Sequence, residues 1–180
     1  MPLIILDRDG VINYDSDEYI KSPDEWIPIP GSLEAIARLN RAGYQVVVAS
    51  NQSGLARGFF DLDTLDRIHQ KMRDELAQAG GSIEALLFCP HGPEDGCACR
   101  KPKPGMLLDI AKKFCCDLAG VPAVGDSLRD IEAAQAVGAR PLLVRTGKGL
   151  LTLEQQAIPD GVSVYDDLAA VADALLLTKT

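Results

Sequence analysis

The feature that most constrains this chain lies near its start, where a short apolar run leads directly into two carboxylates. Residues 3–6 are Leu, Ile, Ile and Leu, and Asp7, Arg8, Asp9 and Gly10 follow. A continuous apolar run of this length is typical of a strand buried on both faces, as in parallel sheets. Side chains two residues apart on extended chain point to the same side. The sequence therefore predicts a buried strand whose carboxyl end presents Asp7 and Asp9 to one site.

Two acids at such a position favour catalytic chemistry over a simple turn. In open α/β sheets ligands bind outside the carboxyl ends of the strands, and a divalent cation relieves the repulsion between two carboxylates. The alternative is a surface turn, because Asp-Gly is a common turn dipeptide. We favour a nucleophilic aspartate with an acid/base partner and a metal ion.

The rest of the chain alternates predicted strands with predicted helices. Its 180 residues suit one domain with a full core. Irregular segments are expected at 11–30 and 89–104, and neither is long enough for a separate cap domain. This pattern predicts right-handed βαβ units, and hence a single three-layer, Rossmann-like α/β domain over residues 1–180 with a mainly parallel sheet. Strands are expected at 45–49, 85–88, 121–124, 141–144 and 163–165, and helices at 31–42, 62–79, 105–114, 128–137 and 168–177.

Composition narrows the class of partner. Apolar residues make up 47% and charged residues 24%, which is typical of a soluble globular protein. No apolar run approaches the ~20 residues that span a bilayer, and no signal peptide is visible, so we expect a cytoplasmic monomer. The net charge of −8 argues against nucleic-acid or anionic-membrane partners. A small phosphorylated substrate remains compatible, since it needs only local positive charge.

Two further motifs offer groups that bind phosphate. Ser50 ends the second predicted strand, and its hydroxyl can donate to a phosphate oxygen while the amides of residues 51–54 form an anion nest. Arg100 and Lys101 stand in a proline-rich frame before a predicted helix, where Lys101 offers a point charge and Arg100 a planar fork. An ordinary polar loop and a solvated basic surface are the respective alternatives.

A fourth motif, Gly125-Asp126-Ser127-Leu128-Arg129-Asp130, follows another predicted strand. Asp126 is placed to complete a magnesium site with Asp7. Asp130 lies one helical turn further on, and we assign it to orienting Lys101 rather than to the metal.

Together, the four motifs resemble those of the haloacid dehalogenase superfamily of phosphatases, over nearly the whole chain. Its first motif is an apolar strand followed by Asp-x-Asp-Gly, and its fourth is Gly-Asp-x-x-x-Asp. The resemblance implies that Asp7 attacks phosphorus and forms an aspartyl-phosphate. It implies that Asp9 protonates the leaving alkoxide and then activates water, with Ser50 and Lys101 on the transferring phosphate. Asp7, the backbone carbonyl of Asp9 and Asp126 are the implied Mg²⁺ ligands.

Three of the five cysteines and one of the two histidines lie within eleven residues. Three thiolates and an imidazole make a known structural zinc set, and without a secretory signal metal ligation is favoured over disulfides. We expect Cys115 and Cys116 to be small packing residues, and His69 to be a surface or packing residue. The predicted zinc ligands are Cys89, His91, Cys97 and Cys99.

With this loop, the chain is similar to the branch of the superfamily that contains D-glycero-D-manno-heptose-1,7-bisphosphate 7-phosphatases and histidinol-phosphate phosphatases. The resemblance implies removal of the 7-phosphate of the heptose bisphosphate, on the way to nucleotide-activated heptose for lipopolysaccharide; histidinol phosphate is the alternative substrate. An inactive, zinc-containing phosphosugar-binding module is a different possibility, and it would not need Asp9.

Without a cap domain, loop residues must recognise the substrate. Arginine pairs bidentately with phosphate, so Arg57 and Arg100 favour a bisphosphate over histidinol phosphate. The expected substrate contacts are Asp15, Asp17, Glu18, Tyr19, Asn51, Gln52, Ser53, Arg57 and Arg100.

Overall fold

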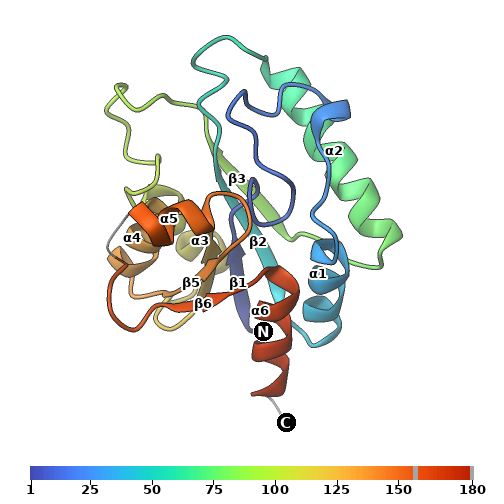
Figure 1. Cartoon of the computed structure of the whole chain (residues 1–180), viewed down its shortest axis with the longest axis vertical. Helices are drawn as coiled ribbons and strands as arrows, with labels where there is room; N and C mark the ends of the chain where they lie inside the picture. The colour runs from blue at the N-terminus through green and yellow to red at the C-terminus, as the bar shows by residue number, and fades with distance from the viewer. Residues whose placement is uncertain (156–157, 179–180) are drawn as a thin grey trace.

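A six-stranded parallel sheet forms the centre of the protein (Figure 1). The computed structural model describes residues 1–155 and 158–178. The strand order is β3-β2-β1-β4-β5-β6, and every neighbouring pair is parallel. This confirms the predicted α/β class. The strands are β1 (Leu3–Leu6), β2 (Gln45–Asn51), β3 (Ala85–Cys89), β4 (Pro122–Gly125), β5 (Arg140–Val144) and β6 (Ser163–Tyr165).

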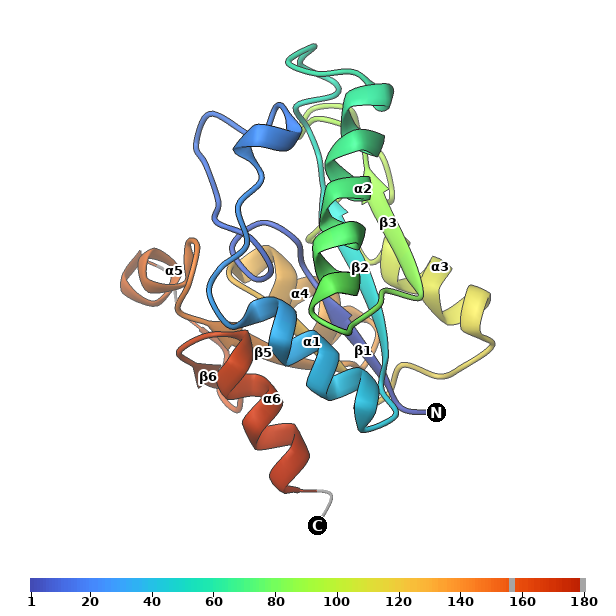
Figure 2. The ribbon, with the colours of Figure 1, turned by 90° about the vertical axis from the view of Figure 1, so that its right-hand side faces the viewer.

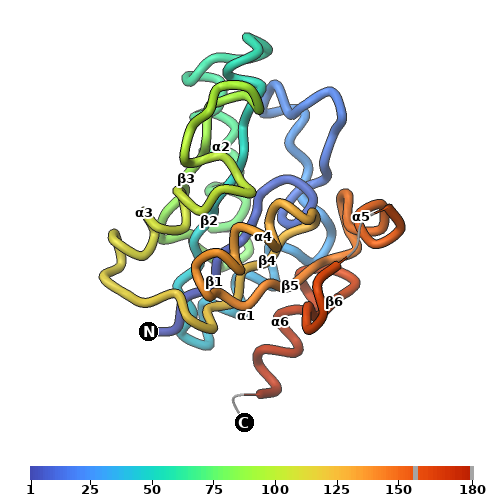
Figure 3. Tube along the Cα trace, turned by 90° about the vertical axis from the view of Figure 1, so that its left-hand side faces the viewer, coloured from blue at the N-terminus to red at the C-terminus, as the bar shows by residue number. Residues whose placement is uncertain are grey.

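Helices cover both faces of this sheet. In Figure 2, α1, α2 and α6 lie over the face turned to the viewer, and Figure 3 turns the face with α3 and α4 forward. Ile4 and Leu6 pack with the first set of helices, whereas Leu3 and Ile5 pack with the second. This double burial explains the unbroken apolar run of β1. The helices are α1 (Ser32–Arg41), α2 (Leu62–Gln78), α3 (Gly105–Phe114), α4 (Leu128–Ala136), α5 (Gly149–Gln155) and α6 (Leu168–Leu177).

Two short elements were not expected from the sequence. A 3₁₀ turn, η1 (Pro23–Glu25), lies in the loop after β1, and α5 follows β5. Only Gly149 and Thr152 of α5 are buried, while Leu150 and Leu151 are exposed. The segment therefore lacks the regular spacing of buried apolar residues that predicts a helix. Within the described residues, no helix is both long and apolar enough to cross a membrane.

The turn after β1 brings its carboxyl end against that of β4. Gly10 has φ +84°, in the left-handed region, and a Cβ built there would lie 2.0 Å from Asp126 Oδ2. Asp7 N donates to the carbonyl of Val124 at 2.9 Å, which continues the pairing of the two strands. Glycine at position 10 therefore lets the first and fourth motifs approach one another.

Candidate active site and metal centre

A cavity of about 180 Å³ opens at the carboxyl ends of the central strands. Most of the residues predicted for the site line it, although they come from loops far apart in the sequence. Those residues are Asp7, Asp9, Asp15, Asp17, Tyr19, Asn51, Gln52, Ser53, Arg100, Lys101 and Asp126.

Lys101 is the buried cation of this cavity. Its Nζ lies 2.7 Å from Asp130 Oδ1 and 3.1 Å from Asp7 Oδ1, and it donates to the carbonyl of Ala49 at 2.8 Å. Burial acts to lower the pKa of Lys101, but the carboxylates of Asp130 and Asp7 outweigh it and raise the pKa. The ammonium is therefore charged and fixed in direction beside Asp7.

Burial and neighbouring carboxylates disfavour the ionised forms of Asp7 and Asp126. Burial raises the pKa of Asp7 to about 7, with the charges of Asp130 and Asp9 adding to the effect and Lys101 opposing it. Burial, followed by the charges of Asp130 and Asp7, raises the pKa of Asp126 to about 8. Buried acids that repel one another in this way favour a bound cation.

The donor set of this cluster fits a hard divalent ion. Oxygen atoms of Asp7, Asp126 and Asp130 all lie within 4.8 Å of one another. Carboxylate oxygens are the ligands that Mg²⁺ prefers. Asp130 is already committed, because its carboxylate accepts from Ser127 Oγ at 2.8 Å and pairs with Lys101. Asp7 and Asp126 are therefore the side chains left to hold the ion.

Asp9 is held by three side chains. Its Oδ1 accepts from Arg8 Nε at 2.8 Å and from Asn13 Nδ2 at 2.9 Å, and its Oδ2 accepts from Gln52 Nε2 at 3.1 Å. Burial acts to raise the pKa of Asp9, but the Arg8 guanidinium and these hydrogen bonds lower it. The carboxylate faces the same cavity as Asp7, in a fixed orientation.

Three of the predicted catalytic and substrate-binding residues lie outside the cavity lining. Ser50 is buried behind it, and its Oγ accepts from Gln52 Nε2 at 2.8 Å. Glu18 does not line it either. Arg57 does not line it, but its guanidinium lies 5.9 Å from the centre of the ring of Tyr19, which does.

Asn51 has a structural part in the site as well as lining it. Its Nδ2 donates to the carbonyl of Lys101 at 3.1 Å, and its Oδ1 accepts from the Lys101 amide at 3.0 Å. This pair of bonds ties the end of β2 to the backbone of the third motif, and so places Lys101.

Two cations in the lining were not predicted. Arg129 lies on the first turn of α4. The pKa of Arg100 is lowered first by burial of its guanidinium and then by the charge of Arg129. The Nζ atom of Lys148 lies 3.6 Å from Asp15 Oδ2, and the backbone amide of Lys148 donates to Asp126 Oδ2 at 2.8 Å. Arg129 stands inside the fourth motif, so its helical position was a usable signal; Lys148 reaches the site only through the β5–α5 connection.

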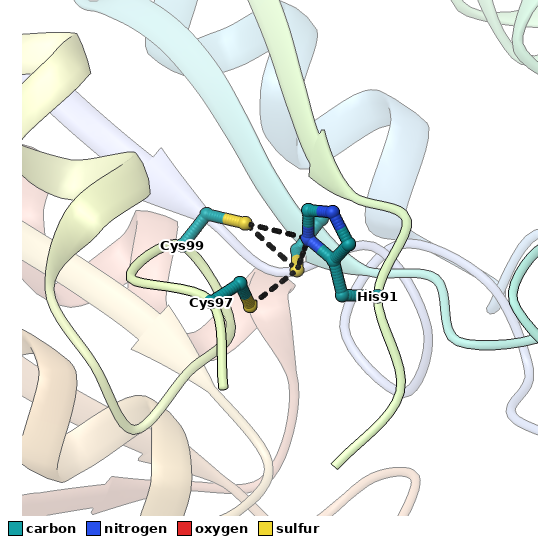
Figure 4. Close-up of side chains that lie close together, drawn as sticks. His91, Cys97 and Cys99 are labelled. Carbon is teal, nitrogen blue, oxygen red and sulfur yellow. Dashed lines mark hydrogen bonds between the residues drawn. The ribbon is translucent and has the colours of Figure 1, made fainter. Parts of the chain in front are cut away.

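The four cysteine-loop residues converge on one point (Figure 4). Cys89 Sγ lies 2.9 Å from Cys99 Sγ and 3.6 Å from Cys97 Sγ, and His91 Nδ1 lies 3.3 Å from Cys99 Sγ. No disulfide joins the described cysteines. One nitrogen and three sulfur atoms around a common centre suit a closed tetrahedral zinc site.

This cysteine cluster is joined directly to the cavity. Arg100 follows Cys99 in the chain, and its Nη1 donates to the carbonyl of His91 at 3.4 Å. The loop that carries the cluster thus also sets the position of a cavity-lining guanidinium.

Comparisons with known proteins agree with this geometry. The family model of HAD-hydrolase-like proteins matches residues 98–171, and that of polynucleotide kinase 3 phosphatases matches residues 3–127. The chain is 64% identical to a D-glycero-beta-D-manno-heptose-1,7-bisphosphate 7-phosphatase of Bordetella bronchiseptica, with 98% of both chains covered. It is 59% identical to the enzyme of the same name from Pseudomonas aeruginosa, with 97% of both covered.

A solved structure is equally similar. The crystal structure of D,D-heptose 1,7-bisphosphate phosphatase from B. bronchiseptica, complexed with magnesium and phosphate, matches with a TM-score of 0.97 and 63% identity over 99% of both chains. The corresponding enzyme from Burkholderia thailandensis matches with a TM-score of 0.78 and 49% identity, over 98% of this chain and 99% of the other.

Proposed function

This chain belongs to the D-glycero-beta-D-manno-heptose-1,7-bisphosphate 7-phosphatase family of the haloacid dehalogenase superfamily, and we propose that it hydrolyses the 7-phosphate of that bisphosphate. The observation that carries the proposal is the meeting of Asp7 and Asp9 with Lys101 and Asp126 in one cavity. The identity of the sugar is supported by relatives that match almost the whole chain.

In the first step, an Asp7 oxygen attacks the phosphorus of the 7-phosphate. The bond between phosphorus and the C7 oxygen breaks as the aspartyl-phosphate forms. The negative charge of the bound phosphate favours the protonated form of Asp9 over the carboxylate of the free site, and this proton passes to the departing oxygen, so that the sugar leaves as an alcohol. Lys101, 3.1 Å from Asp7, is placed to stabilise negative charge on the transferring group.

In the second step, a water molecule attacks the phosphorus of the aspartyl-phosphate. Asp9, now a carboxylate, takes a proton from this water, and the bond between phosphorus and the Asp7 oxygen breaks. Inorganic phosphate leaves, Asp7 is restored as a carboxylate, and Asp9 is again protonated. The hydrogen bonds from Asn13 and Gln52 keep Asp9 facing the cavity through both steps.

Two metals complete the proposal. Asp7, Asp126 and the backbone carbonyl of Asp9 would hold Mg²⁺, which, when bound, offsets the negative charge of the phosphoryl group. Cys89, His91, Cys97 and Cys99 would hold a structural Zn²⁺ that fixes the loop before Arg100. Carboxylate oxygens of Asp7 and Asp126 lie within 4.8 Å of each other, and so do the ligand atoms of the four zinc residues.

Polar and charged side chains at the mouth suit a sugar with a second phosphate. Asp15, Asp17 and Tyr19 can hydrogen-bond hydroxyl groups. Arg100 and Arg129 are close enough for their charges to interact, and this favours an anion between or beside them. We assign the 1-phosphate to this side of the cavity, with Arg57 over the ring of Tyr19. Histidinol phosphate has no second phosphate and carries an amine, so it gains little from these cations.

An inactive binding module explains less of the site. Binding alone needs cations and a metal, but not a carboxylate oriented by three separate donors two residues after the nucleophile. We therefore retain catalysis. Because the chain alone supplies the proposed catalytic side chains, we propose a monomer. Activation of the remaining 1-phosphate uses nucleotides, and so we place the reaction in the cytoplasm.

The test compares kcat/KM for the heptose 1,7-bisphosphate and for histidinol phosphate, with and without Mg²⁺, and follows the heptose product by phosphorus NMR. We expect the bisphosphate to be the better substrate, its 1-phosphate to remain on the product, and turnover to require Mg²⁺. A preference for histidinol phosphate, or earlier release of the anomeric phosphate, would contradict the proposal.

A further inference from the structure

Two buried, polar side chains lie directly behind the acid/base carboxylate. Arg8 has no exposed surface, and His69, on the inner face of α2, is 3% exposed. Arg8 Nη1 lies 3.1 Å from His69 Nε2. A guanidinium can only donate, so His69 Nε2 is the acceptor and the ring is neutral with its proton on Nδ1. The ring of Phe88 on β3 lies against this imidazole, with centroids 6.1 Å apart.

The other side of the Arg8 guanidinium contacts Asp9 with two donors. Nε lies 2.8 Å from Asp9 Oδ1 and Nη2 lies 3.2 Å from Asp9 Oδ2. The guanidinium is planar, so an acceptor that fixes Nη1 also fixes the direction of the other two donors. Arg8 and Asp9 are adjacent in the chain, and the remaining restraints on the Asp9 carboxyl group are the single hydrogen bonds from Asn13 and Gln52.

From this arrangement we propose that His69 is a positioning residue for the reaction: by accepting from Arg8, it holds the guanidinium that orients the carboxyl group of Asp9 toward the departing oxygen. Without that acceptor, a buried donor of Arg8 loses its partner, and the guanidinium turns to satisfy it elsewhere. The Asp9 carboxyl group then keeps only the hydrogen bonds from Asn13 and Gln52, and its orientation shifts. Small errors of position at a proton-transfer group are costly to catalysis.

A leaving-group comparison separates this role from a purely structural one. A sugar alkoxide is a strong base and needs the proton of Asp9 as it departs. The p-nitrophenolate ion is a weak base and departs without it. The value of kcat/KM includes only the steps up to formation of the aspartyl-phosphate, so it excludes the later hydrolysis, which both substrates share. A misdirected Asp9 therefore lowers kcat/KM for the sugar substrate selectively.

We expect His69→Leu to lower kcat/KM for the heptose bisphosphate by about tenfold or more, and that for p-nitrophenyl phosphate by less than about threefold. His69→Gln keeps an acceptor at a similar distance from the backbone, so it should restore most of the lost activity. Met72→Leu is the matched control, because Met72 is fully buried on the same face of α2. Any loss in this control should be equal for the two substrates.

Equal losses for both substrates in His69→Leu, or no rescue by His69→Gln, would overturn the inference. If His69→Leu does not fold, His69→Asn replaces it, because the shorter asparagine side chain does not reach Arg8. The same ratio of kcat/KM losses for the two substrates then decides. The inference rests on the proposed acid/base role of Asp9, so Asp9→Asn is measured alongside. If Asp9→Asn loses kcat/KM selectively for the heptose bisphosphate and the His69 variants do not, only the positioning role of His69 is refuted. If Asp9→Asn itself shows no selective loss, the proposed role of Asp9 is refuted.

Discussion

Among single residues, Asp7 bears the strongest opposing demands. It lies largely buried near the carboxylates of Asp9 and Asp130, yet it must be ionised to attack phosphorus, and the ammonium of Lys101, 3.1 Å away, is the cation that favours its charge. We expect Asp7→Asn to reduce turnover by about a thousandfold or more, because an amide is not a competent nucleophile.

The same substitution should leave the fold intact, since it removes a charge that burial disfavours and leaves Lys101 paired with Asp130. Circular dichroism and phosphate release check the two halves of the prediction. Turnover within tenfold of the parent in a normally folded Asp7→Asn protein would remove Asp7 from the role of nucleophile.

His69 makes folding sensitive to acid. Burial, followed by the charges of Arg8 and Arg73, lowers the pKa of His69 to about 3, with Asp9 acting in the opposite direction. In the unfolded chain the ring titrates near its ordinary value of 6.5. Between these values the unfolded state binds the extra proton. The stabilisation is therefore fully present above pH 6.5 and is lost progressively as the pH falls toward 3.

We expect the free energy of unfolding to fall more steeply with acidification in the parent than in His69→Gln, by up to about 1.4 kcal/mol per pH unit. Urea titrations of both proteins from neutral pH to about pH 4.5 measure the difference, and groups common to both proteins cancel. Parallel curves would show that His69 gains its proton as readily in the folded protein as in the unfolded chain.

The role of a residue could not be predicted where it depends on a contact with a residue far away in the sequence. Arg8 lies inside the first motif, but only the packing of α2 against the loop after β1 shows that it joins His69 to Asp9. The sequence placed His69 at the surface or in packing, and it is a buried packing residue with a polar contact. Arg129 and Lys148 likewise face the cavity only because α4 and the β5–α5 connection end beside it.

At the scale of elements, local pattern predicted most of the fold. The predicted helix over 105–114 has the observed bounds of α3. The predicted helix over 62–79 begins with α2 at Leu62, where the side chain of Asp61 caps it by accepting from Thr64 N at 2.8 Å. The helix α5 was missed because its leucines are exposed. Strand order was not predictable from pattern, since each βαβ unit can place its second strand on either side of the first; the observed order puts β1 between β2 and β4.

The loop between β3 and α3 carries three of the four predicted zinc ligands, and Cys89 ends β3 just before it. Purified protein should contain one tightly bound Zn²⁺ per chain, distinct from exchangeable Mg²⁺. Cys97→Ala removes one of the converging ligands, so zinc content should fall. Because the same loop positions Arg100 and Lys101, kcat/KM should fall by about tenfold or more.

Cys115→Ala is the matched control for that experiment. Cys115 is exposed, so the packing role expected for it from the sequence is wrong, and because it lies outside the cluster its replacement should change neither zinc content nor activity. Elemental analysis and steady-state kinetics on the two variants and the parent decide the matter. Zinc-free parent protein, or a Cys97→Ala variant as stable and active as the parent, would refute a structural zinc site.

Over the whole molecule, charge is distributed unevenly. The chain carries a net charge of −8, yet Arg100, Lys101, Arg129 and Lys148 all line one cavity. A small, doubly phosphorylated substrate can reach these four cations, which stand among the six aspartates of the same cavity, while the rest of the surface stays distant. A polyanion that extends beyond the cavity meets acidic surface instead, since its binding depends on neutralising several successive phosphates.

This contrast bears on the family of polynucleotide kinase 3 phosphatases, whose model matches residues 3–127 of this chain. We expect kcat/KM for a 3′-phosphorylated oligonucleotide to be at least about a hundredfold below that for the heptose bisphosphate at physiological salt, because the net charge repels the nucleic acid. A 3′-phosphorylated mononucleotide is the control, since it offers the same reacting phosphate without the flanking ones.

Faster hydrolysis of the mononucleotide than of the oligonucleotide would assign the discrimination to whole-molecule charge, and equal, slow hydrolysis of both would assign it to recognition of the sugar. Hydrolysis of the oligonucleotide at a rate comparable with that of the heptose bisphosphate would contradict the charge argument, and with it the assignment of this cavity to a small sugar phosphate.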